Sequence, residues 1–237
     1  MVRIILSAIV MLSGCAASAG QLVLNSGNAQ VTLLELYTAQ GCSSCPPAER
    51  WLNEYVDSAD LWSKTVPLAF HVDYWDYIGW KDSLADRAYG ERQRSYALAG
   101  ATHTVYTPEM FANGREWRGW TFRLEPRTSD RKPGNLAVTI TDRILSATFQ
   151  SSDRPLELHI ALLGFGINTK VERGENRNKN LRQEFVVLAH EIHTTTDGRW
   201  NVPVPVTQQP SERHAVAVWI SEPGKPAPLQ ATGGWLE

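Results

Sequence analysis

Two cysteines, Cys42 and Cys45, are the residues of this sequence whose type and spacing most directly allow chemistry. Two thiols three residues apart can close a small disulfide ring. The first thiol can attack a substrate disulfide, and the second can then resolve the mixed disulfide. The pair therefore predicts thiol–disulfide exchange. Half of a zinc site and a structural disulfide are the alternatives that this spacing leaves open.

The cysteines stand between a predicted strand and a predicted helix. Residues 31–37 (VTLLELY) are a short apolar run that predicts a buried strand, and residues 66–72 (VPLAFHV) predict a second one. Between them, apolar residues recur at helical spacing. Strand, helix and strand in this order predict a βαβ unit with a parallel strand pair. A C-x-x-C motif in such a unit is typical of a thioredoxin-like redox site, where helix N–H groups favour the Cys42 thiolate.

Thr107 and Pro108 precede a hairpin that the dipeptide Asn113-Gly114 predicts. Thioredoxin folds place a cis-proline at the start of such a strand, facing the dithiol. We therefore expect the Thr107–Pro108 peptide to be cis, although cis is the minority state of X–Pro bonds. Glu35 interrupts the first apolar strand. A buried carboxylate below the dithiol could act as an acid–base group, and a structural pair or a strand edge is the alternative for Glu35.

Histidines offer an alternative function in metal binding. His71, with Asp73 and Asp76 after the second strand, could ligate copper or zinc together with the two cysteines. The two aspartates could instead cap and orient the aromatic residues between them. His190 and His193 resemble an H-x-x-H motif but lack the i,i+4 helical spacing of zinc peptidases. We expect no cofactor and no resident metal.

The polar segment 127–134 (RTSDRKPG) predicts a linker, and the pattern changes after it. Strand-like runs follow with no long helical pattern, which predicts an antiparallel sandwich. These runs are 136–141, 144–149, 156–163, 181–192, 200–206 and 215–221. The expected fold class is therefore α/β plus all-β. A thioredoxin-like domain at 28–126 would be followed by an antiparallel β-sandwich-like domain at 135–237.

The N-terminus has the features of an export signal. Arg3 and the apolar run 4–12 resemble the first two regions of a secretory signal, and Ala17-Ser18-Ala19 fits a cleavage site, so residues 1–19 are a predicted signal peptide. Leu12-Ser13-Gly14-Cys15 fits a lipobox, in which cleavage before Cys15 gives a lipid anchor. We expect a periplasmic or secreted protein, which could be attached to the outer membrane through Cys15, in a compartment that permits disulfides.

Composition excludes several function classes. The 237 residues contain 23 basic and 25 acidic side chains, a net charge of −2, which argues against a nucleic-acid partner. A hydrophobic content of 43% with nine tryptophans supports a buried core. The apolar run 4–12 is far shorter than the roughly 20 residues that span a membrane. The expected partners are protein or small-molecule thiols and disulfides, together with a redox partner that the sequence does not name.

Four short blocks are spread over the chain between residues 34 and 181. They are LELYTAQGCSSCPPAE (34–49), FHVDYWDYIGWKD (70–82), VYTPEMFANG (105–114) and VERGENRNKNL (171–181). The blocks resemble the signature of a secreted bacterial thioredoxin-like family known as domain of unknown function 1223. The resemblance implies a thioredoxin-like domain followed by a β-rich domain, and no proven reaction. By analogy to thioredoxins, it implies a nucleophile at Cys42, a resolving thiol at Cys45 and the cis-proline at Pro108.

Pro46 and Pro47 set this chain apart from thioredoxins. Pro46 disfavours a helical conformation at Cys45, so we expect the helix to begin at Pro46. Neither proline has an N–H group that could stabilise a thiolate. We therefore expect a Cys42 pKa closer to about 7 than to the roughly 3.5 of a strong oxidant. No terminal helix is predicted after Trp120.

Overall fold

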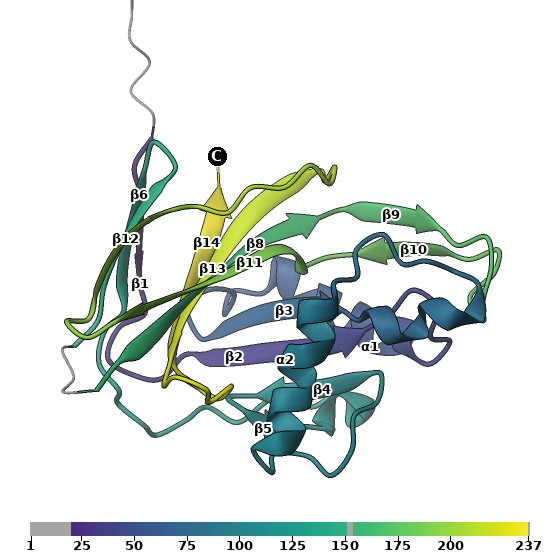
Figure 1. The fold of residues 1–237 in the computed structure, drawn as a ribbon, viewed down its shortest axis with the longest axis horizontal. Helices are drawn as coiled ribbons and strands as arrows, with labels where there is room; N and C mark the ends of the chain where they lie inside the picture. Colours follow the sequence, from purple (N-terminus) through teal and green to yellow (C-terminus); the bar gives the residue numbers. More distant parts are fainter. Residues whose placement is uncertain (1–19, 151–153, 237) are drawn as a thin grey trace, which may run out of the picture.

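Fourteen strands and two α-helices are present in the residues that the structure, a computed structural model, describes: 20–150 and 154–236 (Figure 1). The helices are α1 (Cys45–Asn53) and α2 (Arg87–Leu98), with the short 3-10 helices η1 (Glu54–Asp57), η2 (Asp73–Ile78) and η3 (Gly119–Phe122). The strands of the first half are β1 (Leu22–Asn25), β2 (Thr32–Thr38), β3 (Thr65–His71), β4 (Glu109–Ala112), β5 (Arg115–Glu116), β6 (Ala137–Thr141) and β7 (Ile144–Thr148). Those of the second half are β8 (Leu156–Phe165), β9 (Ile167–Lys170), β10 (Asn180–Gln183), β11 (Val186–Thr195), β12 (Arg199–Pro203), β13 (Arg213–Ser221) and β14 (Pro228–Leu236). The predicted signal peptide and the lipobox with Cys15 lie outside the described residues.

One mixed sheet of eight described strands runs through the molecule in the order β14-β13-β8-β11-β3-β2-β4-β5. β2 and β3 pair in parallel, and β4 pairs with β2 in the antiparallel sense. β11 comes from the second half of the chain. It pairs in parallel with β3 through Val186 and Ala69, and antiparallel with β8. Strands from both halves of the sequence therefore build a single sheet.

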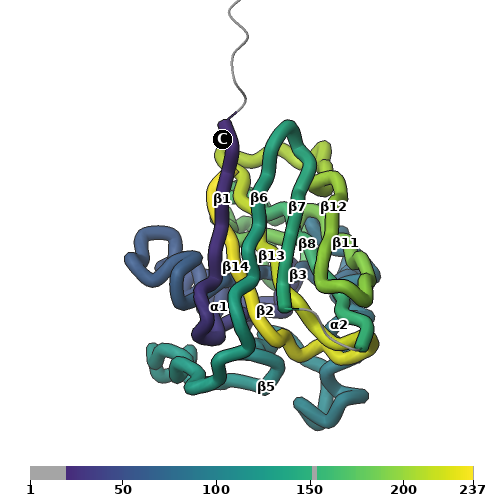
Figure 2. The backbone as a smooth tube through the Cα atoms, turned by 90° about the vertical axis from the view of Figure 1, so that its left-hand side faces the viewer, coloured from purple at the N-terminus to yellow at the C-terminus, as the bar shows by residue number. Residues whose placement is uncertain are grey.

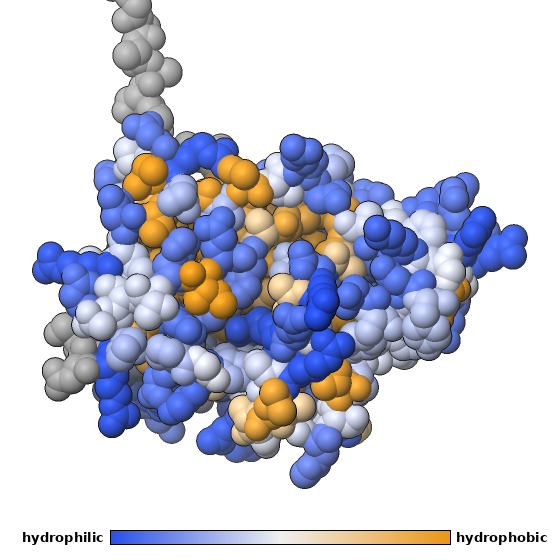
Figure 3. Space-filling view, in the orientation of Figure 1, coloured by the Kyte–Doolittle hydropathy of each residue, from blue (hydrophilic) through white to orange (hydrophobic). Residues whose placement is uncertain are grey.

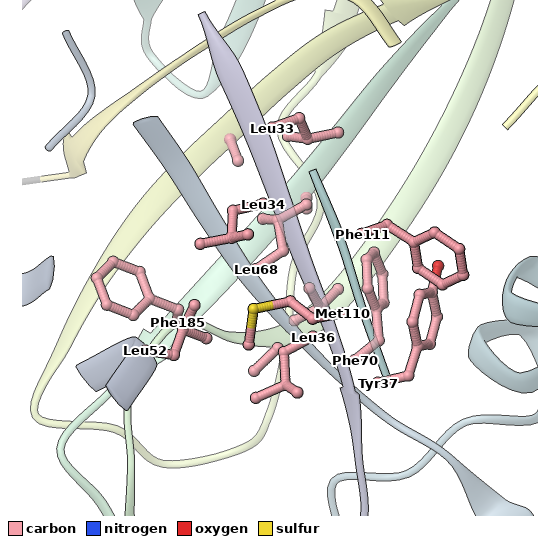
Figure 4. Close-up of a cluster of buried hydrophobic side chains, with 14 of the residues drawn as sticks. Leu33, Leu34, Leu36, Tyr37, Leu52, Leu68, Phe70, Met110, Phe111 and Phe185 are labelled. Carbon is pink, nitrogen blue, oxygen red and sulfur yellow. The ribbon is translucent and has the colours of Figure 1, made fainter. Parts of the chain in front are cut away.

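The predicted fold class is wrong, because the described residues are mostly strand in large multi-strand sheets, with two α-helices and no clear thioredoxin-like α/β arrangement. β3 is buried along its whole length. β2 pairs with one lateral edge of β3, and β11 pairs with the other. A parallel strand of this kind is stable only when both faces and both edges are covered. One apolar cluster accordingly joins Leu36 and Phe70 with Phe185 and Trp219 from the second half of the chain. Figure 4 shows Leu36, Phe70 and Phe185 in this cluster.

A second sheet, β1-β6-β7-β12, is antiparallel throughout and lies over β8, β13 and β14 (Figure 2). β13 serves both cores because successive side chains of a strand point to opposite faces. Val216 and Val218 enter the core under the second sheet, whereas Ala217 and Trp219 enter the core around β2 and β3. β9 and β10 form a separate two-stranded hairpin.

Several local predictions are confirmed. The two apolar runs form β2 and β3, and the helix between them is α1. α2 starts after Asp86. The Asp86 carboxylate caps α2 by accepting a hydrogen bond of 2.8 Å from the Ala88 amide. Asn113 and Gly114 both have positive φ and form the turn between β4 and β5. The run expected as one strand over 181–192 is divided into β10 and β11 at Phe185, whose φ is +59°.

β14 was not predicted from the sequence. Its residues, PLQATGGWL, include a proline and two glycines, which are rare in strands. The two glycines do not form a turn, and they allow neighbouring side chains to pack closely against the backbone of β14. A Cβ at Gly233 would lie 2.5 Å from the Trp62 ring, and one at Gly234 would lie 2.5 Å from a methyl group of Leu24. β14 therefore depends on tertiary contacts that a propensity scale does not register. β1 and β9 were also not predicted.

The two α-helices cover opposite faces of β2. Thr38 contacts Glu49 of α1, whereas Glu35 contacts Arg92 of α2, and residues 35 and 38 of one strand point to opposite faces. Neither helix, nor any other in the described part of the chain, is long and apolar enough to cross a membrane. On the face shown in Figure 3, hydrophilic side chains separate the hydrophobic patches from one another.

Candidate functional site

Cys42 and Cys45 form a disulfide between the end of β2 and the start of α1. Their Cα atoms are 5.4 Å apart, and both side chains are 0% exposed. α1 begins at Cys45. The expected start at Pro46 is therefore wrong by one residue. Pro46 and Pro47 fall in the first turn, where a missing N–H group is tolerated because it has no partner within the helix. The C-x-x-C motif is thus a closed disulfide at a strand–helix junction.

Strand register brings several candidate residues to one edge of the sheet. Thr38, the last residue of β2, is opposite His71, the last residue of β3. Tyr37 is opposite Glu109, the first residue of β4, so Pro108 lies at the same edge. The segment that carries the cysteines leaves β2 at this point. Loops at the carboxyl ends of parallel strands are the usual place for a site.

The Thr107–Pro108 peptide is cis, as the sequence predicted. Pro108 is buried, and Thr107 is half-buried. The Trp75 indole nitrogen donates a hydrogen bond of 2.6 Å to the Thr107 hydroxyl oxygen. Trp75 belongs to η2, which follows β3, so this bond ties the loop after β3 to the start of β4.

The turn between β9 and β10 holds the cysteine segment in place. Asn176 is fully buried, and its side-chain amide donates to the carbonyl oxygens of Gln40 at 2.9 Å and Cys42 at 2.8 Å. The Glu175 carboxylate accepts from the amide of Ser43 at 3.0 Å and from its hydroxyl at 2.6 Å. These bonds hold the pKa of Glu175 below its usual value. Figure 1 shows the β9–β10 hairpin reaching toward α1.

Glu35 lies away from the cysteines, in a buried ion pair on the α2 face of the sheet. Its carboxylate oxygens accept from Arg92 Nε and Nη2, both at 2.9 Å. The hydroxyl groups of Tyr37 and Tyr96 donate to the same carboxylate at 2.9 and 2.6 Å. These contacts are those of the structural pair that we considered as the alternative for Glu35. The catalytic role of Glu35 stays a prediction, and none of these contacts joins Glu35 to the cysteines.

Glu49 is a second buried carboxyl group, and it lies on the face that carries the cysteines. It follows Cys45 by four residues in α1 and is 5% exposed. The Thr38 hydroxyl donates a hydrogen bond of 2.6 Å to Glu49 Oε1. Burial raises the pKa of Glu49, although His71 and the bond from Thr38 act in the opposite direction. A buried carboxyl with a raised pKa near a dithiol is an acid–base candidate.

His71 and Asp82 form a buried pair beside Glu49. His71 Nδ1 lies 2.7 Å from Asp82 Oδ2, and both side chains are buried. Burial alone would lower the pKa of His71, but the Asp82 carboxylate raises it above the usual value. Burial would raise the pKa of Asp82, but His71 and two backbone amides lower it. In the described residues, His71 Nε2 has no hydrogen-bond partner.

The histidines do not assemble a metal site. Within residues 20–150 and 154–236, no three His, Cys, Asp or Glu side chains are grouped so that they could hold a metal ion. His190 and His193 are three residues apart in β11, so they point to opposite faces. His190 stacks on His159 and Trp219, and burial lowers its pKa to about 3. His193 Nε2 lies 3.1 Å from the carboxylate of Glu191, which belongs to the same strand.

Sequence reasoning missed the residues that surround the disulfide most closely. Glu49 was not singled out, yet the spacing 45, 49 and 52 places it on the buried side of α1. Asp82 and Asn176 had no local signal, because their partners lie more than 10 residues away or in another strand pair. Glu175 and Asn176 do fall in one of the four blocks quoted above, and this was the available signal.

A model of the family described as protein of unknown function DUF1223 matches residues 33–221. The chain belongs to this family. The membership that the four blocks implied is confirmed, whereas the secreted location attributed to the family stays a prediction. A comparison with curated proteins gave no match.

Two solved structures are similar in fold to this DUF1223 protein. The crystal structure of protein AGR_C_4864 from Agrobacterium tumefaciens is 22% identical, with a TM-score of 0.62, over 86% of this chain and 94% of that chain. HBP35 of Porphyromonas gingivalis is 11% identical, with a TM-score of 0.58, over 89% of this chain and 76% of that one. At these identities the likeness concerns the fold alone.

Proposed function

We propose that this protein is a thiol–disulfide oxidoreductase that uses Cys42 and Cys45. The observation that carries the proposal is the Cys42–Cys45 disulfide at the carboxyl end of β2, at the sheet edge where the cis-proline Pro108 also lies. Two cysteines at this spacing alternate readily between a dithiol and a disulfide. The buried carboxyl group of Glu49 adds an acid–base group to the same edge.

The proposed reaction is an exchange in two steps. The Cys42 thiolate attacks one sulfur of a substrate disulfide, forms a mixed disulfide and releases the other substrate sulfur as a thiolate. The Cys45 thiolate then attacks Cys42 Sγ, releases the second substrate thiolate and closes the Cys42–Cys45 disulfide. The substrate disulfide gains the two electrons that the dithiol loses. The reverse sequence oxidises a substrate dithiol.

Access to the sulfur atoms requires local motion. Both cysteines are fully buried, although Ser43 and Ser44 between them are exposed. The turn containing Glu175 and Asn176 binds this segment through four hydrogen bonds. We infer that exchange proceeds from a minor state in which this turn has moved away, because proteins open locally at a lower free energy than global unfolding requires.

Location and partners are part of the same proposal. The export signal predicted at residues 1–19 supports a periplasmic or secreted protein, with a lipid anchor at Cys15 as the alternative form. An extracytoplasmic compartment would maintain the disulfide. The substrates would be protein or small-molecule thiols and disulfides. A separate redox partner would restore the starting state of the dithiol.

The test is the capture of a mixed disulfide. Reduced protein carrying Cys15→Ser is mixed with glutathione disulfide, quenched with acid and analysed by mass spectrometry. The Cys45→Ser variant should accumulate glutathione on Cys42, whereas the Cys42→Ser variant should accumulate far less on Cys45. The proposal fails if the wild-type dithiol does not exchange, or if Cys42 is alkylated no faster than Cys45.

A structural disulfide within a binding protein is the second candidate, and the complete burial of both sulfur atoms favours it. Structural disulfides have reduction potentials below about −300 mV. Equilibration of the protein with glutathione and dithiothreitol buffers measures this potential. A value below that limit, together with no mixed disulfide, would favour the structural role. The copper or zinc alternative with His71 has no such support, since the described residues contain no group of three His, Cys, Asp or Glu side chains that could hold a metal ion.

A further inference from the structure

A buried carboxyl group lies on the same side of α1 as Cys45. Cys45 and Glu49 are four residues apart in the helix, and side chains at this spacing are neighbours with Cβ atoms about 5–6 Å apart. Both side chains are buried, at 0% and 5% exposure. The geometry points to Glu49 as the group that takes the proton from Cys45 Sγ and returns it, an inference that rests on the exchange function proposed above.

Among the described residues, one side chain donates to the Glu49 carboxylate, at Oε1, and this leaves Oε2 for proton transfer. Thr38 donates to Oε1 at 2.6 Å and so fixes the orientation of the carboxyl group. Thr38 ends β2, the strand from which the cysteine segment departs. Position is therefore set from two elements, β2 and α1, which is the rigid support that proton transfer to a nearby thiol requires.

Charged groups from each neighbouring element face Glu49. His71 comes from β3, Asp82 comes from the segment between η2 and α2, and Arg50 is the next residue of α1. Burial raises the pKa of Glu49, while His71 and Arg50 lower it and Asp82 raises it further. The net effect is a pKa of Glu49 above the usual value of a glutamate. A carboxyl group whose pKa is raised accepts a proton more readily, and it can return this proton to a neighbouring thiolate.

The proton balance closes in both directions of exchange. When the dithiol reduces a substrate, the Glu49 carboxylate takes the proton of the Cys45 thiol, and the resulting thiolate attacks Cys42 Sγ. The Cys42–substrate sulfur bond breaks, and the substrate leaves as a thiolate. When an incoming thiolate attacks Cys42 in the disulfide, the S–S bond breaks. Cys45 then leaves as a thiolate and receives the proton from the Glu49 carboxyl.

Glu35 is the competing candidate, and the sheet separates it from this reaction. Glu35 contacts Arg92 and Tyr96 of α2, whereas Cys45 and Glu49 belong to α1, on the other face. The arginine binds both Glu35 oxygens, and two tyrosine hydroxyls donate to the same carboxylate. The two buried glutamates therefore predict different outcomes for the same Glu→Gln substitution.

The experiment measures the two exchange steps separately. Reduced full-length protein with Cys15→Ser is mixed with glutathione disulfide and quenched with acid at short times, between pH 5 and 9. Mass spectrometry follows mixed-disulfide formation at Cys42 and its resolution by Cys45. The variants are Glu49→Gln, Glu49→Asp and Glu35→Gln. Glu54→Gln, an exposed position directly after α1, is the matched charge control.

We expect Glu49→Gln to slow resolution at least about tenfold, and to leave the first step within about twofold. The pH profile of resolution should change its shape in Glu49→Gln, because the Cys45 thiol then titrates without the carboxyl group, whereas Glu49→Asp should keep a carboxyl contribution. Unchanged resolution in Glu49→Gln, or slower resolution in Glu35→Gln alone, would overturn the inference. If Glu49→Gln does not fold, Glu49→Asp decides, and a rate and profile equal to wild type would overturn it. Failure of the exchange function itself is distinct, because wild type would then form no mixed disulfide.

Discussion

The amides around Cys42 have acceptors other than a sulfur atom. Ser43 donates its N–H to Glu175, Cys45 donates to the Cys42 carbonyl, and Pro46 has no N–H group. A helix start stabilises a thiolate through amides that point at the sulfur, so little of this stabilisation is available here. We therefore expect a Cys42 pKa nearer to about 7 than to about 3.5. Titration of the thiolate absorbance in a Cys45→Ser variant measures it.

The same titration in a Cys45→Ser, Glu175→Gln protein is the matched comparison. Neutralising Glu175 removes a negative charge close to Cys42 and weakens its hold on the Ser43 amide. The Cys42 pKa should then fall relative to the protein that retains Glu175. A midpoint below about 5 in the protein with Glu175 would show that the argument from the prolines and the shared amide is wrong.

The buried His71–Asp82 pair predicts a pH window of stability. The pair raises the pKa of His71 and lowers that of Asp82. A raised histidine pKa stabilises the fold fully below the usual value of 6.5, and this stabilisation is lost as the pH rises through the folded pKa. A lowered aspartate pKa stabilises the fold above 3.8, and this stabilisation is lost as the pH falls through the folded pKa. Stabilisation is therefore complete between these two usual values.

Urea unfolding of wild type and Asp82→Asn at a series of pH values tests this window. The free energy of unfolding of wild type should exceed that of the variant most between pH 3.8 and 6.5, and the difference should shrink on both sides. Asparagine keeps one acceptor oxygen for the Gln40 and Leu84 amides, and the loss of the other adds a part that does not vary with pH. A difference that is the same at every pH would contradict the ion pair.

At the scale of elements, the β9–β10 hairpin controls access to the disulfide. Asn176→Ala removes the two bonds that the hairpin turn makes with the carbonyls of Gln40 and Cys42. At about 1 kcal/mol for each bond, the open state should gain population about 10- to 30-fold. The pseudo-first-order rate of disulfide reduction by dithiothreitol should rise by a similar factor.

Asn168→Ala is the control for this hairpin prediction. Asn168 lies on β9 of the same hairpin, and its side chain donates to the Gly166 carbonyl, away from the cysteine segment. Its replacement should leave the reduction rate close to that of wild type. Equal rates in wild type and Asn176→Ala would mean that the turn does not limit access to the sulfur atoms.

Local patterns predicted elements well and their long-range pairing poorly. The apolar runs of β2 and β3, the Asn113-Gly114 turn and the cis Thr107–Pro108 peptide all have causes within a few residues. The parallel pairing of Val186 with Ala69 has no local cause, because it joins segments more than 100 residues apart. The candidate site divides in the same way. The cysteines were evident from spacing, whereas Glu49 and Asn176 acquire their roles from partners in other elements.

At the scale of the whole molecule, contacts between the two halves are numerous and buried. Arg92 of α2 donates to the Pro226 carbonyl at 3.2 Å, and the Tyr96 hydroxyl oxygen lies 3.0 Å from the same carbonyl oxygen. The Arg92 guanidinium also lies 5.2 Å from the centre of the Trp219 ring in β13. An arginine that pairs with Glu35 in the first half thus packs against the second half. The interior around β3 belongs to both parts of the chain.

This shared interior predicts that the described chain unfolds as one cooperative unit. Removing β11 would expose the edge of β3, and removing β13 would uncover Ala217 and Trp219 in the core that contains Leu36. We expect a single transition in urea, with tryptophan fluorescence and far-ultraviolet circular dichroism coinciding. A fragment of residues 20–130 should lack a cooperative transition, because a sheet edge and an apolar face remain uncovered. Two separate transitions, or a cooperatively folded fragment, would instead establish independent domains at the linker over 127–134.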